Sequence, residues 1–410
     1  MLESSKKNAW IVMVGCFLMC FVVLGVSNSP MSLFIVPVTE FFGFSRGSFA
    51  LLFTLMSISG MVTQFFFGPL LKKLGIRTLI VSGLVLAPIT FYIFYTANSL
   101  TAFYAGGVLI GLVLGLNSVT SVSILIHDWF DKNQGTIMGV ILAGSGLGGA
   151  LFSVIIGNSI AQNGFKNAYL LTMIILAVIA LPLILMIKPN PAHKKTSGQE
   201  SQSSAEEKEQ EAVKPPLTFM MFIKKPVNLI GLLAVFLIGF VVQPILINTP
   251  GYLIEKGFDS VFAAQISGSI FLVLAIGKIL MGIIHDKFGI KISLLFGLGV
   301  FLISTTTLLL AASKPAVWVF VGFYGFAVAV FVLIVPLFAK AVLGKEDYDS
   351  YLGVFMAALG AGVGVGTPLM NYTYDILGSY SASVGAFIVI GGIAFLLALL
   401  SLQIKDRQAA

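Results

Sequence analysis

Charged side chains are scarce in this sequence. Of its 410 residues, 10% are Asp, Glu, Lys or Arg and 58% are hydrophobic, and the mean hydropathy is +1.01. A soluble protein of this length needs far more charge to cover its surface. Apolar runs of about 20 residues recur along the chain, long enough to cross a hydrocarbon core about 30 Å thick. The composition therefore excludes a soluble protein and predicts a helical membrane protein with many spans.

Cysteine and histidine are also scarce. The two cysteines, Cys16 and Cys20, lie in the first apolar run, where no other Cys or His accompanies them. We expect them to pack at lipid depth without forming a disulfide or a metal site. His127 and His285 fall at predicted helix ends, where a solvated turn residue is favoured over a proton relay. The chain also lacks a nucleophile–base pair at membrane depth, so neither an enzyme nor a cofactor is expected.

Twelve apolar runs are separated by charged or Gly-, Pro- and Asn-rich breaks, and each predicts one transmembrane helix. The predicted helices cover residues 9–35, 47–70, 78–97, 101–126, 135–160, 167–187, 226–248, 261–284, 291–312, 316–340, 351–374 and 380–403. Residues 188–216 contain almost no large apolar side chain, so they cannot bury enough surface to fold. We therefore predict an all-α membrane protein with 12 transmembrane helices in two six-helix halves. The halves are residues 1–188 and 223–410, joined by a flexible linker over 189–222.

The placement of Lys and Arg, whose excess gives the net charge of +7, predicts how the chain is oriented. With the N-terminus in the cytoplasm, most Lys and Arg residues lie on the cytoplasmic side, and the outer loops hold only Arg46, Lys166, Lys256 and Lys314. This distribution follows the positive-inside rule and requires no nucleic-acid partner. The first apolar run has no small-residue cleavage site after it, so it is expected to remain as a span. We expect a monomer in the cell membrane with both termini and the linker in the cytoplasm.

The two halves repeat each other at a constant offset of 214 residues. Matched pairs include Gly43 with Gly257, Gly83 with Gly297, Gly111 with Gly325, Gly139 with Gly353 and Gly146 with Gly360. One offset that holds across five successive helices is hard to obtain by chance. Six helices per half, both entered from the same side, indicate a parallel repeat about an axis along the membrane normal. Transporters with internal repeats bind substrate near the bilayer midplane between the repeated units.

Two predicted cytoplasmic loops carry related glycine-spaced charges. The first reads GPLLKKLGIRT and contains Gly68, Gly75 and Arg77; the second reads GIIHDKFGIKI and contains Gly282, Asp286, Lys287, Gly289 and Lys291. Glycines permit a tight turn and close helix approach, and an acidic residue can cap a helix. The spacing resembles the loop signature of the major facilitator superfamily, which implies its twelve-helix fold and a conformational role for these residues. Lys72 departs from the signature, because the family has Asp at that place.

Two further stretches resemble one branch of that superfamily. PVTEFFGFSRGSFALLF, residues 37–53, and HDWFDKNQGTIMGVILAGSGLGG, residues 127–149, are similar to segments of monocarboxylate porters and oxalate–formate exchangers. Those families carry a substrate-binding basic residue in helix 8, and Lys278 stands at that place. The exchangers add a second cation in helix 11, which residues 352–374 lack. The resemblance therefore implies that Lys278 binds substrate and favours a monocarboxylate over a dicarboxylate.

Lys278 is also singled out by its position alone. It is the one charged residue clearly inside a predicted span, where a cation costs about 2.5–3.5 kcal/mol to insert. No Asp or Glu lies in a predicted span to neutralise it, so an anion from solution is the natural partner. The alternatives are a snorkelling lysine or a static polar contact. Desolvation in an empty cavity disfavours the charged lysine and a bound monoanion restores it, so Lys278 is also expected to carry the proton.

Other polar side chains in the predicted spans are candidates to bind substrate. Each of them is also suited to a hydrogen bond between helices, which is the commoner role of such residues. The candidates are Asn28, Gln64, Asn117, Gln243, Tyr324, Asn371 and Tyr372. Gln64 is the most informative of these, because the 214-residue offset pairs it with Lys278.

The sequence thus predicts a secondary transporter of small organic monocarboxylates, such as lactate or pyruvate, in symport with protons by alternating access. The expected partners are the monocarboxylate, protons and the lipid bilayer. Three alternatives remain. They are an exchanger of the oxalate–formate type, an exporter of larger amphipathic compounds, which the 35 phenylalanines would suit, and a sensor that has kept the fold but lost transport.

Overall fold

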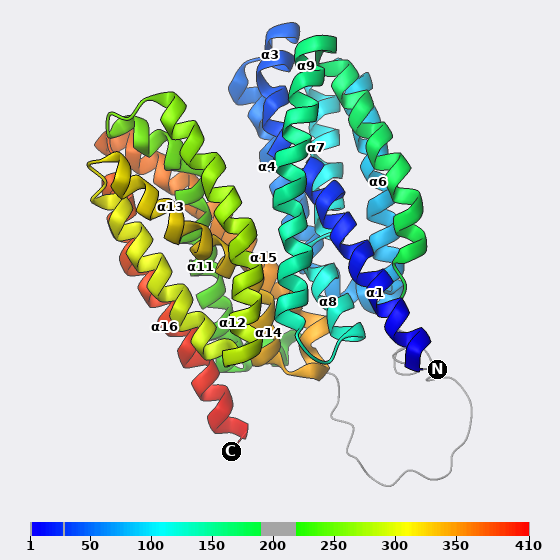
Figure 1. Ribbon diagram of the computed structural model, residues 1–410, viewed down its shortest axis with the longest axis vertical. Helices are drawn as coiled ribbons and strands as arrows, with labels where there is room; N and C mark the ends of the chain where they lie inside the picture. Colours follow the sequence, from blue (N-terminus) through cyan, green and yellow to red (C-terminus); the bar gives the residue numbers. More distant parts are fainter. Residues whose placement is uncertain (1, 28, 190–218, 410) are drawn as a thin grey trace.

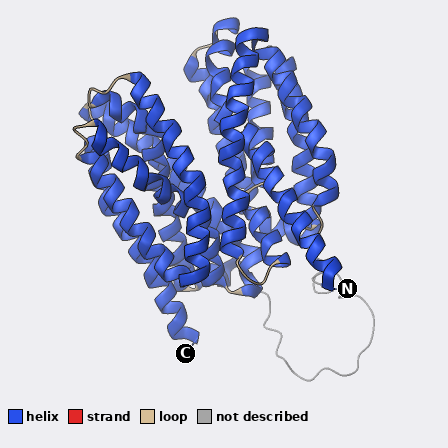
Figure 2. Ribbon diagram, viewed as in Figure 1, coloured by secondary structure: helices blue, strands red, loops and turns tan. Residues whose placement is uncertain are grey.

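A computed structural model describes residues 2–27, 29–189 and 219–409, which contain helices and no strand (Figures 1 and 2). The first half consists of α1 (Leu2–Met19), η1 (Cys20–Leu24), α2 (Gly25–Ser27), η2 (Ser29–Phe34), α3 (Ile35–Phe42), α4 (Arg46–Phe65), α5 (Phe67–Leu74), α6 (Ile76–Thr96), α7 (Leu100–Leu116), α8 (Val119–Trp129) and α9 (Gln134–Met186). The second consists of α10 (Phe219–Lys224), α11 (Pro226–Glu255), α12 (Ser260–Leu309), α13 (Lys314–Ala329), η4 (Val330–Ile334), α14 (Val335–Leu343), α15 (Lys345–Leu377) and α16 (Ser381–Ala409).

The helices begin and end where local sequence signals place them. Ser45 caps α4 by accepting a hydrogen bond from the backbone N–H of Ser48 at 3.1 Å, and Asp259 caps α12 in the same way through Phe262 at 2.8 Å. These side chains satisfy backbone donors that have no partner within the first turn of the helix. Pro226 opens α11, where its missing N–H removes no helical hydrogen bond.

The described helices make twelve membrane spans, which confirms the predicted fold class. Among the described residues, nine helical segments are apolar and long enough to cross a bilayer, and α4 with α5, bent by 58°, form a tenth. Two of these segments are double spans, because α9 changes direction at Gly164 (φ 79°) and α12 at Gly289 (φ 78°). A straight α9 of 53 residues would be about 80 Å long, far more than one crossing requires.

The backbone repeats at the offset found in the sequence. Glycines with positive φ occur in three pairs that are 214 residues apart: Gly43 with Gly257, Gly75 with Gly289, and Gly164 with Gly378. The break between α7 and α8 at residues 117–118 also corresponds to the π-helical turn η4 at residues 330–334. The two halves therefore share turns and helix irregularities as well as helix number.

The two halves meet closely at one end and diverge toward the other. A Cβ added to Gly282 would lie 2.2 Å from the carbonyl oxygen of Gly135, and one added to Gly68 would lie 1.9 Å from that of Ser350. Farther along the same helices, a Cβ at Gly268 or Gly364 would have nothing within 4 Å. We call the first region the closed end; both chain termini lie toward it, and the ribbons separate toward the opposite, open end (Figure 1).

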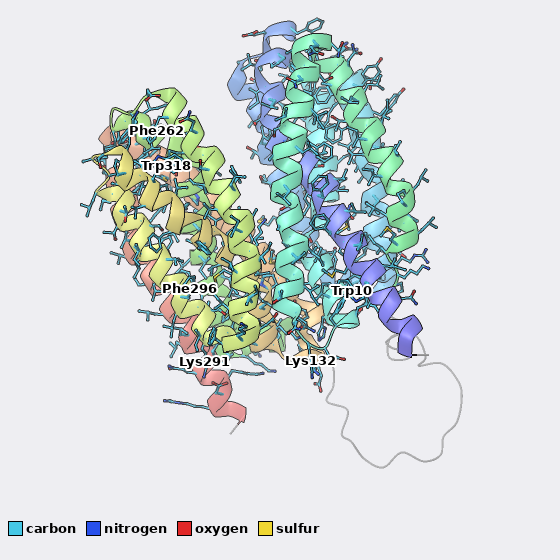
Figure 3. All side chains as sticks on the ribbon, in the orientation of Figure 1. Trp10, Lys132, Phe262, Lys291, Phe296 and Trp318 are labelled. Carbon is cyan, nitrogen blue, oxygen red and sulfur yellow. The ribbon has the colours of Figure 1, made fainter. Side chains whose placement is uncertain are left out.

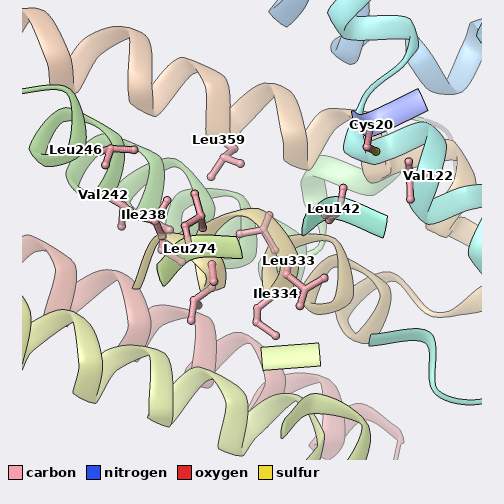
Figure 4. Close-up of a cluster of buried hydrophobic side chains, with 14 of the residues drawn as sticks. Cys20, Val122, Leu142, Ile238, Val242, Leu246, Leu274, Leu333, Ile334 and Leu359 are labelled. Atoms are coloured by element: carbon pink, nitrogen blue, oxygen red, sulfur yellow. The ribbon is translucent and has the colours of Figure 1, made fainter. Parts of the chain in front are cut away.

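The surface and the interior differ as expected for a protein in a bilayer. Large aromatic side chains such as Trp10 and Trp318 are exposed on the surface, by 62% and 47%. The lysines Lys132 and Lys291 lie near the closed end (Figure 3). Inside, hydrophobic residues of both halves gather in one cluster (Figure 4). Helix α10 covers residues 219–222 of the expected linker, where the ring of Phe222 stacks on Tyr351 at 4.3 Å between centroids. Residues 190–218 lie outside the described residues.

Candidate functional site

A cavity of about 470 Å³ lies between the two halves. Its walls come from η1, α4, α7, α8, α9, α11, α12, α13, η4 and α15, so both halves contribute. Most of the lining is apolar. The polar side chains among the lining residues are Ser57, Gln64, Ser118, Ser145, Gln243 and Lys278. Lys278 is the only charged residue among those that line it, so a positive charge without an acidic neighbour dominates the electrostatics of the cavity.

Lys278 reaches from the second half to the first. Its side chain on α12 is 4% exposed, and its Nζ donates to the carbonyl oxygen of Leu142 at 3.0 Å and to the Oγ of Ser145 at 3.1 Å. Both acceptors belong to α9. The backbones are also close here, because a Cβ at Gly139 would lie 2.3 Å from the carbonyl oxygen of Lys278. None of the ion pairs found in the described residues includes Lys278, so neutral acceptors alone compensate its charge.

Gln64 and Gln243 also line the cavity, as the sequence predicts for candidate substrate ligands. Gln64 is held in place, because its Nε2 donates to the carbonyl oxygen of Gly115 at 3.2 Å and its Oε1 accepts from the Oγ1 of Thr120 at 2.7 Å. The repeat partner of Lys278 thus stands on the opposite wall of the same cavity. Gln64 is partly buried and already oriented by its neighbours.

The other candidates from the sequence lie elsewhere. Asn117 is buried against α6, where a Cβ at Gly83 would lie 2.1 Å from its Nδ2. The hydroxyl of buried Tyr324 donates to the carbonyl oxygen of Val242. Neither residue lines the cavity, and the same holds for two residues of α15 nearer the open end: Asn371, which donates to Thr367 at 3.1 Å, and Tyr372, which is 63% exposed. Asn28 lies outside the described residues.

Two polar lining residues, Ser57 and Ser145, are absent from the predicted set of substrate ligands. Ser145 is the more informative, because it belongs to the glycine-rich stretch AGSGLGGALF of α9 and contacts Lys278 directly. The stretch reads as a helix-packing motif, and Gly144 and Gly148 do pack against Phe17 and Phe21. Its one hydroxyl would have indicated a polar face among the glycines.

At the closed end, Asp286 joins the halves. Its carboxylate accepts hydrogen bonds from the backbone N–H groups of Gly135 at 2.9 Å and Thr136 at 2.7 Å, which begin α9 in the other half. A carboxylate at a helix N-terminus is stabilised both by these donors and by the helix dipole. Gln134 beside them also accepts a hydrogen bond from Lys340 of α14. Asp286 therefore caps a helix across the interface between the halves.

The other motif residues form turns and surface contacts. Gly75 and Gly289 have φ 78°, a conformation that favours glycine and turns the chain between successive spans. Lys291 pairs with Asp406 at 2.5 Å, Lys287 is exposed, and Arg77 donates to the carbonyl oxygen of Ile184 at 3.5 Å.

The first loop has no acid that corresponds to Asp286, and the helix it faces explains why. Lys72 is exposed on α5, which packs on α15. The first turn of α15 already contains Glu346 and Asp347. These two carboxylates complement the dipole of α15 from within the helix, so another acid at residue 72 would add like charge to the same end.

This arrangement has known relatives. The family model of the Major Facilitator Superfamily matches residues 15–342 and 266–409. The chain belongs to the Major Facilitator Superfamily. It is a multi-pass membrane transporter and not an enzyme.

The relatives of this transporter are named for different substrates. The Agnestins efflux protein AgnL12 of Paecilomyces divaricatus is 26% identical over 97% of the chain and 88% of its own length. Monocarboxylate transporter 12-B of Danio rerio is 20% identical over 91% and 83%. Among solved structures, FucP, the fucose:proton symporter of E. coli, superposes in its outward conformation with a TM-score of 0.73 at 16% identity, covering 96% of this chain and 99% of FucP.

Proposed function

We propose that this transporter carries small organic monocarboxylates, of the size of lactate or pyruvate, in symport with protons. The observation that supports the proposal is Lys278, the one charged side chain on the cavity wall, which is 4% exposed and has no carboxylate partner in the described residues. A buried cation at membrane depth is expensive unless it is compensated. An anionic substrate supplies that compensation, and one cation matches one carboxylate.

The contacts of Lys278 suggest how binding leads to transport. In the structure its ammonium donates to Leu142 and Ser145 of α9, so it helps to hold the two halves together. A substrate carboxylate is a stronger acceptor than a carbonyl or a hydroxyl and competes for the same protons. Substrate binding would then weaken a contact between the halves and favour the alternate state, in which the closed end opens.

The proton follows from the same charge balance. A carboxylate bound to protonated Lys278 forms a neutral pair, which crosses the barrier more readily than either ion alone. Release of the substrate leaves the lysine in a cavity without acidic lining residues, and loss of its proton on the same side completes the symport cycle. Lys278 would thus be substrate receptor and proton carrier together.

We also propose that the closed end faces the cytoplasm. The lysines near it, among them Lys132 and Lys291 in Figure 3, give it the positive side expected of a cytoplasmic face. The cavity then opens outward, so the described conformation is the one that accepts substrate from outside the cell.

Uptake by proteoliposomes tests the proposal. Purified protein is reconstituted and given radiolabelled lactate, pyruvate, formate or oxalate, with and without an inward proton gradient. We expect gradient-driven uptake of the monocarboxylates, loss of uptake in Lys278→Gln, and wild-type uptake in Lys314→Gln, whose lysine is exposed on the same half. Efficient oxalate–formate exchange without proton dependence would contradict the proposal, as would normal pH-driven uptake by Lys278→Gln.

A second candidate, export of larger amphipathic compounds, is favoured by one feature. An apolar groove of about 350 Å³ lies beside the cavity, between α4, α11 and α15, and Met61 lines both. The relative AgnL12 is itself an efflux protein. If this candidate function is right, the proteoliposomes show no uptake of monocarboxylates but transport a labelled long-chain amphiphile, and Ala358→Trp, which fills the groove, abolishes that transport.

A further inference from the structure

Three potential metal ligands meet at the closed end, on the boundary between the halves. His127 and Asp128 stand near the end of α8 in the first half, and Asp349 stands in the first turns of α15 in the second. One ligand atom from each residue lies within 4.8 Å of the other two. His127 and Asp128 are neighbours in the sequence, whereas Asp349 lies more than 200 residues later, so only the tertiary fold brings it to them.

The polar atoms of this cluster are incompletely satisfied. The Nδ1 of His127 lies 3.6 Å from Oδ1 of Asp349, beyond a hydrogen bond. Both atoms are shielded from solvent, and neither has a hydrogen-bond partner. The ring of His127 packs edge-on against Tyr348, with 5.4 Å between centroids. A buried nitrogen and a buried carboxylate oxygen that face each other without bonding require an explanation, because such atoms are nearly always paired.

We propose that His127, Asp128 and Asp349 bind a divalent transition-metal ion, with Zn²⁺ as the representative, which fastens the two halves together at the closed end. One imidazole and two carboxylates suit Zn²⁺ or Mn²⁺ better than Mg²⁺ or Ca²⁺, which prefer oxygen ligands throughout. Metal–ligand distances of about 2.0–2.2 Å place neighbouring ligand atoms roughly 3–3.5 Å apart, so rotations that draw the three atoms together by about 1 Å complete the site. Water fills the remaining coordination positions.

Nearby charges are compatible with this ion. Lys340 and Lys345 lie in the same region and oppose a cation, whereas Asp131 adds a further negative charge. The ammonium of Lys340 is already engaged with Gln134 of the other half. The two carboxylates of the cluster therefore provide the local negative charge that the ion needs.

The position of the site determines its effect. The ligands come from both halves, so they surround one ion only while the closed end is closed. An ion that binds one conformation and not the other shifts the population toward the first. Metal binding is therefore an inhibitory signal that holds the transporter open on the side of the open end. This effect does not depend on which substrate is carried.

Metal affinity is the first test. Untagged full-length protein in detergent competes with a fluorescent chelator for Zn²⁺, and His127→Gln, Asp349→Asn and the control His285→Gln are compared with it. Loss of an outer-shell partner alone weakens metal sites by about 10- to 100-fold, so we expect at least a tenfold loss for the first two variants and none for the control. Equal affinity in the wild type, His127→Gln and Asp349→Asn, each eluting as a single folded species, overturns the site.

The second test measures conformation. It distinguishes an ion that only binds from an ion that also holds the two halves together. Spin labels at Lys132→Cys and Lys287→Cys, exposed residues of opposite halves, report the separation at the closed end. The native cysteines, Cys16 and Cys20, are fully buried. We expect Zn²⁺ to narrow the distance distribution to its short component, and His127→Gln to abolish this response while His285→Gln keeps it. A distribution that Zn²⁺ leaves unchanged overturns the proposed action on conformation.

Discussion

The two side chains proposed to meet the substrate, Lys278 and Gln64, are each held by specific neighbours. Lys278 is held by Leu142 and Ser145, and Gln64 is held by Gly115 and Thr120. The two sets stand on opposite walls of one cavity. A substrate that enters it meets side chains whose orientation is already set, which lowers the ordering cost of binding.

Thr120 tests the value of that orientation. Its hydroxyl donates to Gln64 at 2.7 Å, and Thr120→Val removes the donor while keeping the shape of the side chain. Because one such hydrogen bond contributes about 0.5–1.5 kcal/mol, we expect the KM for uptake to rise roughly two- to tenfold. Thr120→Ser keeps the hydroxyl and should keep the KM. Equal KM values for the two variants would show that Gln64 needs no positioning.

Asp286 provides a prediction about the balance between conformations. Asp286→Asn removes the charge that caps α9 across the interface, which is worth about 1 kcal/mol and therefore about fivefold in a conformational equilibrium. Alkylation of a cysteine at Ser57, on the cavity wall, measures access from the open end. We expect slower alkylation in Asp286→Asn and a wild-type rate in Lys287→Gln, whose exposed side chain caps no helix. The same rate in both variants would contradict the proposed role.

At the scale of helices, small residues decide how near the halves can come. The clearest comparison lies within α12, where a Cβ at Gly282 meets the backbone of Gly135 at 2.2 Å and a Cβ at Gly268 meets nothing within 4 Å. Backbone atoms cannot move aside as a flexible side chain can. Gly282 is therefore a site of contact between halves, whereas Gly268 is an ordinary helix position.

The paired substitutions Gly282→Ala and Gly268→Ala test this difference. We expect Gly282→Ala to force the closed end apart and to lower the thermal unfolding temperature of the purified protein. Gly268→Ala should raise that temperature or leave it unchanged, because alanine stabilises a helix by about 0.5–1 kcal/mol relative to glycine. Equal unfolding temperatures in a fluorescence melt would mean that the halves are not in close contact at Gly282.

The sequence predicted where the helices lie better than it predicted which side of each helix points to the cavity. Apolar length located the twelve spans, and the offset of 214 residues predicted turns such as Gly75 and Gly289. The rotation of each helix could not be predicted, because a transmembrane helix is apolar on all sides and has no distinct polar stripe. Asn117 and Tyr324 are therefore polar residues of predicted spans that face other helices. Lys278 could be identified because a charge at that depth is rare. The cluster at His127 could not, because it includes Asp349 from the other half, and the sequence does not show that the two residues meet.

At the scale of the whole molecule, the two halves behave as units that meet at one end. Alternating access requires the closed end to separate while the opposite end comes together. Three contacts hold the halves together there: Lys278 with α9, Asp286 with the start of α9, and Lys340 with Gln134. They all cross from one half to the other.

A covalent link at this end should stop the cycle. Cysteines at Gln134 and Lys340, whose side chains are hydrogen bonded, can be joined by a short bis-methanethiosulfonate cross-linker, which binds each thiol through a reducible disulfide. We expect transport to fall to background after cross-linking and to return on reduction, whereas each single variant treated alike keeps its activity. Undiminished transport by the cross-linked protein would show that the closed end does not open.

The two loops after the second and eighth spans have the same origin in the repeat, but only one carries an acid that fastens the halves. Asp286 caps α9 of the other half. Lys72 cannot cap a helix in this way, and the first turn of α15 contains its own carboxylates, Glu346 and Asp347. The repeat contains two copies of the motif, and the first copy no longer provides the helix-capping acid that the second provides. Position 72 of the first loop can therefore vary while Gly68 and Gly75 keep their contact and turn, whereas the second loop also depends on its acid at position 286.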